Sequence, residues 1–130
     1  MTKTILMDKY PVFSHEIKKD ATSFQTVDAV IEYLKGLIQK HPVAEYIAIF
    51  DHYQHTSNLG EDLIAEEILD AKNLIFCFGK QIAITKILAV RPRSIGVCEL
   101  KDSFMIDWME APNEKLQKTL EEWVESIEKN

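Results

Sequence analysis

Two stretches of the sequence are apolar on one side only, at the spacing of an α-helix, and they restrict the possible folds most strongly. The first begins near Thr26 and stops at Pro42, and the second follows Pro112. Each contains apolar residues that recur every three or four positions and form one stripe: Val27, Val30, Ile31, Leu34, Leu37 and Ile38 in the first, and Leu116, Leu120, Trp123, Val124 and Ile127 in the second. Such a stripe has to be buried against another layer, so we expect each helix to cover one face of a sheet.

The residues that flank these stretches are typical of helix ends. Thr26 and Asn113 can each cap a first turn by accepting a backbone hydrogen bond, and Asp28 is favourable near the positive end of the helix dipole. Lys40 suits the opposite end of the first helix, and Pro42 prevents the helix from continuing. Local chemistry and periodicity therefore predict the same boundaries.

Segments rich in β-branched and aromatic residues supply the sheet. We predict strands over residues 11–19, 44–53, 73–79, 94–102 and 103–111, the last two joined by a turn at Lys101–Ser103. The final strand alternates between two sets of side chains, one on each face: Phe104, Ile106 and Trp108, and Met105, Asp107 and Met109. We expect the first set to pack on a helix. The methionines of the second set would need cover, which a second copy of the chain can supply.

Two further segments are ambiguous. Residues 61–70 place apolar side chains among five acidic ones, and we interpret them as a short surface helix. Residues 80–90 are apolar at nearly every position, so periodicity does not decide, and we predict a largely buried helix. The whole sequence predicts a single α+β domain over residues 1–130. Its expected architecture is a β-α-β4-α sandwich, with a mixed or antiparallel sheet under two long helices and extra short helices between the middle strands.

The composition limits the classes of partner. The chain is 46% apolar and 28% charged. Its net charge of -6 argues against nucleic-acid binding, because a negative protein repels the phosphates. No apolar run is long enough for a membrane span and the N-terminus lacks a secretory signal, so we expect a cytoplasmic protein without membrane binding. Cys77 and Cys98 lie in apolar contexts and are expected to be buried thiols, not a disulfide or zinc ligands.

Asp51, His52 and His55 follow an apolar strand directly and form the first candidate site. Imidazoles and carboxylates are suitable ligands for zinc or another first-row divalent ion. The two histidines would share a side only in a helix or turn, since a continued strand points them to opposite faces. The alternative is a strand end in which Asp51 accepts backbone N–H groups and His52 is hydrogen-bonded beneath a loop. We expect His52 to line a small pocket at the strand end. An imidazole ordinarily titrates near neutral pH, which suits a proton relay or a pH-sensitive contact there.

Arg91 and Arg93 flank Pro92 and are the only arginines of the chain. A guanidinium group is a planar fork that matches carboxylate or phosphate. The pair therefore predicts an anion site or a salt bridge between subunits. The alternative is a solvated turn with weak surface ion pairs.

Several motifs resemble the family known as domain of unknown function 302. Asp51-His52 followed by Gly60 is similar to that family's D-H-x-x-x-A-x-x-x-G signature. Residues 74–79 (LIFCFG) resemble the strand before the family's F-G-N-P turn, and Thr85 falls where a G-T follows that turn. The opening of the helix at residues 23–38 is also similar.

The similarity spans about residues 12–125 and includes the hairpin that ends in Ala111-Pro112. The chain departs from the family's motifs at three places. Lys80-Gln81 stands where the family has Asn-Pro, and Ile84 stands where it has the glycine before its threonine. Thr56 replaces the alanine of the first signature. The resemblance implies a β-α-β4-α sandwich like that of the TATA-binding protein, assembled as a homodimer. It implies no biochemical activity.

The sequence contains no glycine-rich phosphate loop, nucleophile elbow or dinucleotide fingerprint. We therefore predict a non-enzymatic homodimer that binds a small ligand, an anion or a protein partner. Its candidate ligand-binding residues are Asp51, His52, Arg91 and Arg93. The alternative is a small enzyme or metal-dependent protein that uses His52 with Asp51 or His55, with the two histidines as metal ligands. The sequence indicates no particular cofactor.

Overall fold

The computed structural model describes residues 1–130, apart from the side chain of Glu61. Its strands are β1 (Thr2–Leu6), β2 (Tyr10–Lys18), β3 (Glu45–Phe50), β4 (Asp70–Cys77), β5 (Arg93–Glu99) and β6 (Ser103–Met109). Its helices are α1 (Val27–Lys40), α2 (His52–Leu59) and α3 (Glu114–Ser126), and its 3-10 helices are η1 (Lys19–Ala21), η2 (Glu61–Leu63), η3 (Thr85–Ala89) and η4 (Ile127–Lys129). None of the helices in these residues combines the length and hydropathy needed to span a bilayer.

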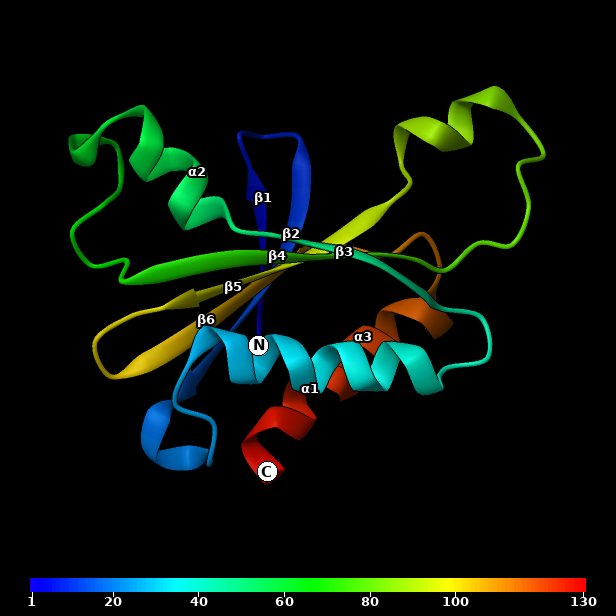
Figure 1. The fold of residues 1–130 in the computed structure, drawn as a ribbon. Helices are drawn as coiled ribbons and strands as arrows, with labels where there is room; N and C mark the ends of the chain where they lie inside the picture. The colour runs from blue at the N-terminus through cyan, green and yellow to red at the C-terminus, as the bar shows by residue number, and fades with distance from the viewer.

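The six strands form one antiparallel sheet in the order β1-β2-β6-β5-β4-β3. Both long helices, α1 and α3, lie against the same face of this sheet (Figure 1). The predicted α+β architecture is therefore confirmed, with the short helices α2, η2 and η3 inserted between the middle strands.

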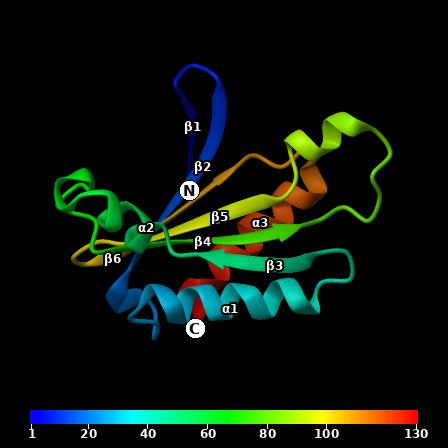
Figure 2. The ribbon, with the colours of Figure 1, turned by 45° about the horizontal axis from the view of Figure 1, so that its top comes forward.

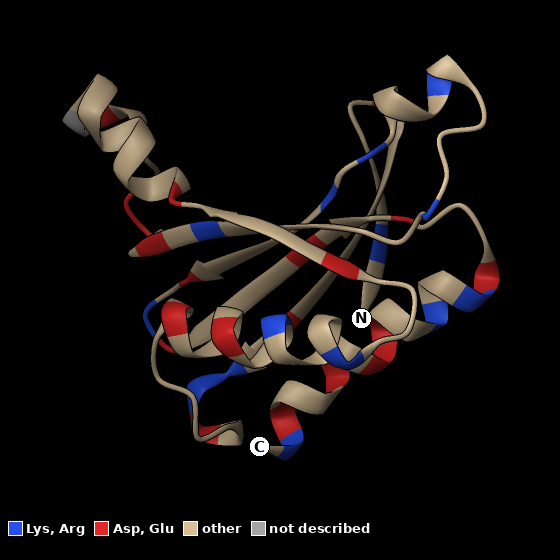
Figure 3. Ribbon diagram, turned by 45° about the vertical axis from the view of Figure 1, so that its right-hand side comes forward, with Lys and Arg blue, Asp and Glu red and all other residues tan. Residues whose placement is uncertain are grey.

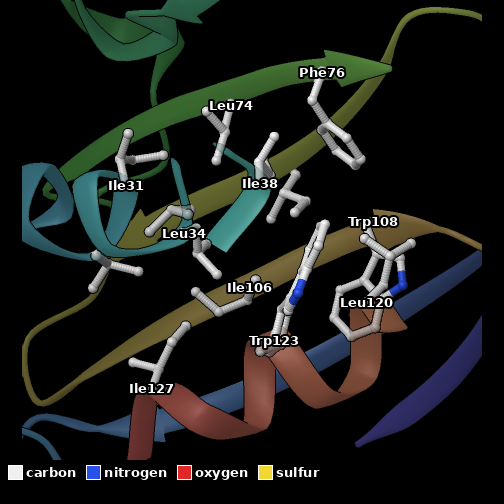
Figure 4. Packing of buried hydrophobic residues seen from close by; sticks show 14 of the residues in the cluster. Ile31, Leu34, Ile38, Leu74, Phe76, Ile106, Trp108, Leu120, Trp123 and Ile127 are labelled. Carbon is white, nitrogen blue, oxygen red and sulfur yellow. The ribbon is translucent and has the colours of Figure 1, made fainter. Parts of the chain in front are cut away.

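The core lies between the sheet and the two long helices (Figure 4). Both predicted stripes pack there, with Leu37 and Leu116 only partly buried, and Phe104, Ile106 and Trp108 are buried as the alternation along β6 predicts. Met105, Asp107 and Met109 point to the other face, which the long helices leave uncovered. We call this second surface the open face.

The ends of the long helices follow the sequence prediction closely. Thr26 Oγ1 accepts a hydrogen bond from Ala29 N at 3.0 Å, and Asn113 Oδ1 accepts one from Leu116 N at 2.9 Å. These caps satisfy backbone donors that have no partner within the helix. After α1, His41 Nδ1 accepts the N–H of Val43 at 3.1 Å and thereby holds the turn into β3.

The N-terminal hairpin is the largest feature that the sequence prediction missed. Strands β1 and β2 form a ribbon whose free end stands above the open face (Figure 2). Three residues connect the paired Leu6 and Tyr10, and two of them, Met7 and Asp8, have φ values of 54° and 57°, in the left-handed region common in hairpin turns. Every residue of β1 is exposed, so its side chains show no alternation of apolar and polar positions. Without that alternation, periodicity gives no signal for a strand.

Three local predictions were wrong. The strand predicted over 44–53 ends at Phe50, because Asp51 caps a helix that begins at His52. Residues 61–70 contain only the short η2 and the first residue of β4, not a surface helix. Residues 80–90 are mostly exposed and contain only η3, so the buried helix expected there is absent. Apolar composition indicated burial, but this segment leaves the sheet and projects from it (Figure 1).

Candidate functional site

A groove of about 820 Å³ crosses the open face between the N-terminal hairpin and the middle of the sheet. Its walls are largely apolar and include Leu6, Tyr10 and Met109. The polar side chains on its floor include four from four different strands: Ser14, Asn73, Ser94 and Asp107. A mostly apolar concavity with a few convergent polar groups is the usual form of a small-ligand site.

The register of the sheet aligns the polar groups in one row. Ser14 is paired with Asp107, Asp107 with Gly96, and Gly96 with Asn73. All four therefore lie side by side across β2, β6, β5 and β4, with their Cβ directions on the open face. The row exists only because three separate strand pairings have matching registers.

Gly96 opens a gap in the middle of this row. A Cβ built at Gly96 would lie 3.6 Å from the Asp107 backbone oxygen and 3.7 Å from Asn73 Nδ2, at ordinary contact distance. Space for a side chain therefore exists but is left empty, between the carboxylate of Asp107 and the amide of Asn73. A ligand group placed above Gly96 would have an acceptor on one side and an amide on the other.

Hydrogen bonds orient the polar groups at both ends of the row. Ser14 Oγ donates to Asp107 Oδ1 at 2.5 Å. At the other end, Asn73 Nδ2 donates to Ser94 Oγ at 3.3 Å, and Asn73 Oδ1 lies 2.9 Å from His52 Nδ1. With the amide assigned this way, His52 carries its proton on Nδ1 and leaves the Nε2 lone pair free when neutral.

His52 does not line this groove but a second, smaller cavity of about 250 Å³ between α2 and the sheet. Tyr53, Leu63, Ile68 and Cys98 contribute to its largely apolar lining. Burial raises the pKa of the Cys98 thiol, and the carboxylates of Asp107 and Asp70 raise it further. A thiol needs a lowered pKa to act as a nucleophile, so its surroundings disfavour this role for Cys98.

The structure places His52 and His55 together and Asp51 apart from them. Because α2 begins at His52, the two histidines stand three residues apart on one helix, with ring centroids separated by 6.4 Å. Of the two cases that the sequence left open, the structure shows the helix, which places both histidines on one side. Asp51 Oδ1 instead accepts the N–H of Gln54 at 3.0 Å, and Oδ2 lies 3.9 Å from Lys72 Nζ. Among the residues with described side chains, no three His, Cys, Asp or Glu are grouped to hold a metal ion.

The two arginines do not converge. Arg91 lies against Gly79, and its Nη1 donates to the backbone oxygen of Gln81 at 2.7 Å. Arg93 lines the 820 Å³ groove, but its Nη2 donates to the backbone oxygen of Met109, and burial lowers its pKa. Each guanidinium is thus already bonded to a carbonyl, and the structure gives the pair no common anion site.

Sequence reasoning placed Asp107 on the correct face but did not identify the row as a site. The available signal was weak: one acidic residue between two methionines on β6, and a glycine in the middle of β5. A glycine inside a strand often marks close approach of another group. Its alignment with Asn73 and Ser14 required the strand order, which no local pattern encodes.

Comparison with known proteins supports a different family from the one that the motifs resemble. No curated protein and no solved structure matched the chain. The match found was to a family described only as a family of unknown function (DUF6858), over residues 1–129. The resemblance to the domain of unknown function 302 family is therefore corrected. Because the match covers almost the whole sequence, this chain belongs to the DUF6858 family.

Proposed function

We propose that this protein is a non-enzymatic homodimeric module that binds a small ligand in the groove of the open face. The observation that carries the proposal is the row Ser14, Asp107, Gly96 and Asn73 at the floor of an apolar groove. Small-ligand sites have volumes of about 300–1,000 Å³, and the groove's 820 Å³ lies in that range.

The row favours a ligand with a hydrogen-bond donor and an apolar body. Asp107 supplies a carboxylate beside the empty space over Gly96, and an ionised acceptor forms stronger hydrogen bonds than a neutral one. Leu6, Tyr10 and Met109 offer apolar contact for the rest of the molecule. An amine with an aliphatic or aromatic body combines both features.

The test fills the gap without disturbing the fold. Gly96→Val places a side chain over the row, and a β-branched residue is favourable in a strand, so the variant should fold. A thermal-shift screen of aliphatic and aromatic amines, with the matching alcohols and carboxylates, should give hits on the unmodified protein that Gly96→Val abolishes.

Asp107→Asn tests the charge of the row. It should weaken amine hits selectively, and Asp102→Asn, the same change in the exposed turn between β5 and β6, should not. Amine hits that survive both Gly96→Val and Asp107→Asn would exclude the groove as the site.

The homodimer is supported by apolar side chains left exposed around the open face. Met109 is 42% exposed on β6, and Leu6 and Tyr10 are exposed on the hairpin above it. Large exposed apolar areas on small proteins commonly mark interfaces. Light scattering coupled to size exclusion should give the mass of a dimer, and a strict monomer at all concentrations would refute this part of the proposal.

The alternative function is that of a metal-dependent protein or small enzyme that uses His52 with His55 or Asp51. The proximity of the two imidazoles on α2 favours His55 as the partner, because Asp51 is engaged as a helix cap. Calorimetric titration of untagged protein with Zn²⁺ tests it. Binding that His55→Ala removes would support the metal-dependent form of this alternative, and an absence of binding would exclude a zinc site there.

A further inference from the structure

Two segments of opposite charge rise from the open face on opposite sides of the groove. Residues 79–93 contain two lysines, two arginines and no acidic residue, and we call them the basic arm. Residues 59–70 contain five acidic residues and no basic one, and we call them the acidic arm. We infer that a second copy of this chain covers the open face, with the acidic arm of each copy against the basic arm of the other. This inference rests on the proposed homodimer and specifies its geometry.

The basic arm combines free charge with exposed apolar side chains. Ile82 is 73% exposed, and Ile84, Leu88 and Val90 are exposed as well. Lys80 and Lys86 are also exposed and form no ion pair with any described side chain. An exposed segment of this composition in a soluble domain indicates a surface that contacts something else.

The acidic arm has the matching properties. Leu59 is 68% exposed, and Leu63 and Leu69 are exposed beside it. Glu66 and Glu67 are exposed and take part in no ion pair with any side chain that the structure describes. Each arm therefore presents apolar contact area together with charges that have no partner in its own chain.

The arrangement of the arms selects the symmetry of the dimer. Both arms rise on the face opposite α1 and α3, at opposite ends of the middle strands (Figures 1 and 3). Suppose that two copies face each other with their open faces together. A two-fold axis then lies in the plane between the two sheets, perpendicular to the line that joins the arms. This rotation places the acidic arm of each copy over the basic arm of the other. Because a two-fold interface repeats every contact, the complementary pairing occurs twice.

The surface area is sufficient for such an interface. The chain has an accessible surface of 8299 Å². A compact monomer of its mass, 15.0 kDa, should expose about 7,000 Å². The chain therefore exposes about 1,000 Å² more than a compact monomer of this mass. One partner of a standard stable interface contributes about 800 Å², which is less than this difference.

A second copy fits the face better than a lipid surface does. The basic arm alone would suit anionic headgroups, since it joins lysines to exposed apolar side chains. The acidic arm on the same face would be repelled by those headgroups. A partner that binds both arms needs a basic surface opposite the acidic arm and an acidic surface opposite the basic arm. A second copy of the chain, turned to face the first, has that arrangement. The second copy would also close the groove, so the ligand would be enclosed between two protomers.

Charge reversal tests the pairing. Lys80→Glu/Lys86→Glu changes the net charge of the basic arm from +4 to 0, and Glu66→Lys/Glu67→Lys changes that of the acidic arm from -5 to -1. Each variant alone should raise the dissociation constant of self-association at least about tenfold, since the attraction between the arms is removed twice per dimer. Mixed in equal amounts, the two variants should form a heterodimer, which native mass spectrometry resolves. Lys115→Glu/Lys118→Glu and Glu122→Lys/Glu125→Lys on α3 are controls with the same charge changes away from the open face.

The outcomes separate this inference from the proposal on which it rests. A monomeric unmodified protein overturns both the homodimer and the arm pairing. A dimer that persists in each reversed variant, or two reversed variants that do not associate when mixed, overturns the arm pairing and leaves the homodimer standing. Sedimentation of the unmodified protein with vesicles of phosphatidylcholine and phosphatidylserine, lost in Lys80→Glu/Lys86→Glu, would assign the face to lipid and overturn the inference.

Discussion

Asp107 and Asn73 lie on the same row of the sheet with only Gly96 between them. Each is oriented by hydrogen bonds to other side chains: Asp107 accepts from Ser14, and Asn73 donates to Ser94 on β5 and contacts His52 on the side away from Gly96. The two polar groups are therefore held in place before any ligand arrives. Such preorganisation lowers the entropy lost on binding.

The contact between Asn73 and His52 should fix the tautomer of the imidazole. In the neutral form, we expect the proton on Nδ1, because Asn73 Oδ1 lies 2.9 Å from that atom. Long-range nitrogen–proton NMR correlations at alkaline pH should show one dominant tautomer. Asn73→Ala should give the mixture typical of free imidazole, and a mixture already present in the unmodified protein would contradict the assigned contact.

The cap of α3 should make a measurable contribution to stability. Asn113→Ala removes the acceptor of the Leu116 N–H, and we expect a loss of about 0.5–2 kcal/mol in the free energy of unfolding. Urea denaturation measures the change. Asn113→Asp keeps an acceptor and adds a charge that suits the helix N-terminus, so it should retain the stability. No loss in Asn113→Ala would show that the cap contributes nothing, and equal losses in both variants would show that the lost acceptor is not the cause.

Gly79 should control the order of the basic arm. A Cβ at this position would lie 2.0 Å from the central guanidinium carbon of Arg91, so Gly79→Ala must displace that side chain from Gln81. The displaced group is the flexible end of a long side chain, so we expect little change in global stability. Limited proteolysis should cut residues 80–90 faster in Gly79→Ala than in Gly36→Ala, whose added methyl group meets no atom within 4 Å. Equal cleavage rates would rule out the stabilising role of Arg91.

Cys98 should react slowly and only at high pH. Burial, followed by the nearby carboxylates of Asp107 and Asp70, raises its pKa, and the thiolate is the form that alkylating reagents attack. In a Cys77→Ser background, alkylation by iodoacetamide should begin at higher pH than for the same chain unfolded in urea. Asp107→Asn should move the onset part of the way down, because one of the carboxylates is removed.

The raised pKa of Cys98 also makes the free energy of unfolding depend on pH. With a raised pKa in the folded state, the unfolded chain loses the Cys98 proton first as the pH rises. The contribution of the Cys98 thiol to the free energy of unfolding is therefore present at low pH. It is lost as the pH rises from the thiol's pKa in the unfolded chain through its pKa in the folded protein. Removing the thiol by Cys98→Ser should eliminate that part of the alkaline destabilisation. Identical pH profiles with and without the thiol would refute it.

The sequence by itself determined the elements that have a strong local signal. The two amphipathic helices, their caps at Thr26 and Asn113, and the two faces of β6 are present where the pattern predicts them. These features depend on periodicity and on side chains that bond to the backbone within a few residues. Such interactions are the same in any tertiary context, so they can be derived from the sequence alone.

The tertiary structure decided what local patterns leave open. Residues 80–90 are as apolar as a buried helix but project from the sheet, since composition does not specify which surfaces meet. Asp51 ends a strand and caps a helix, and this choice brings His52 and His55 together. The row from Ser14 to Asn73 joins residues far apart in the chain through three strand pairings. Strand order and register arise from packing of the whole chain, and therefore only the folded structure places these side chains in one groove.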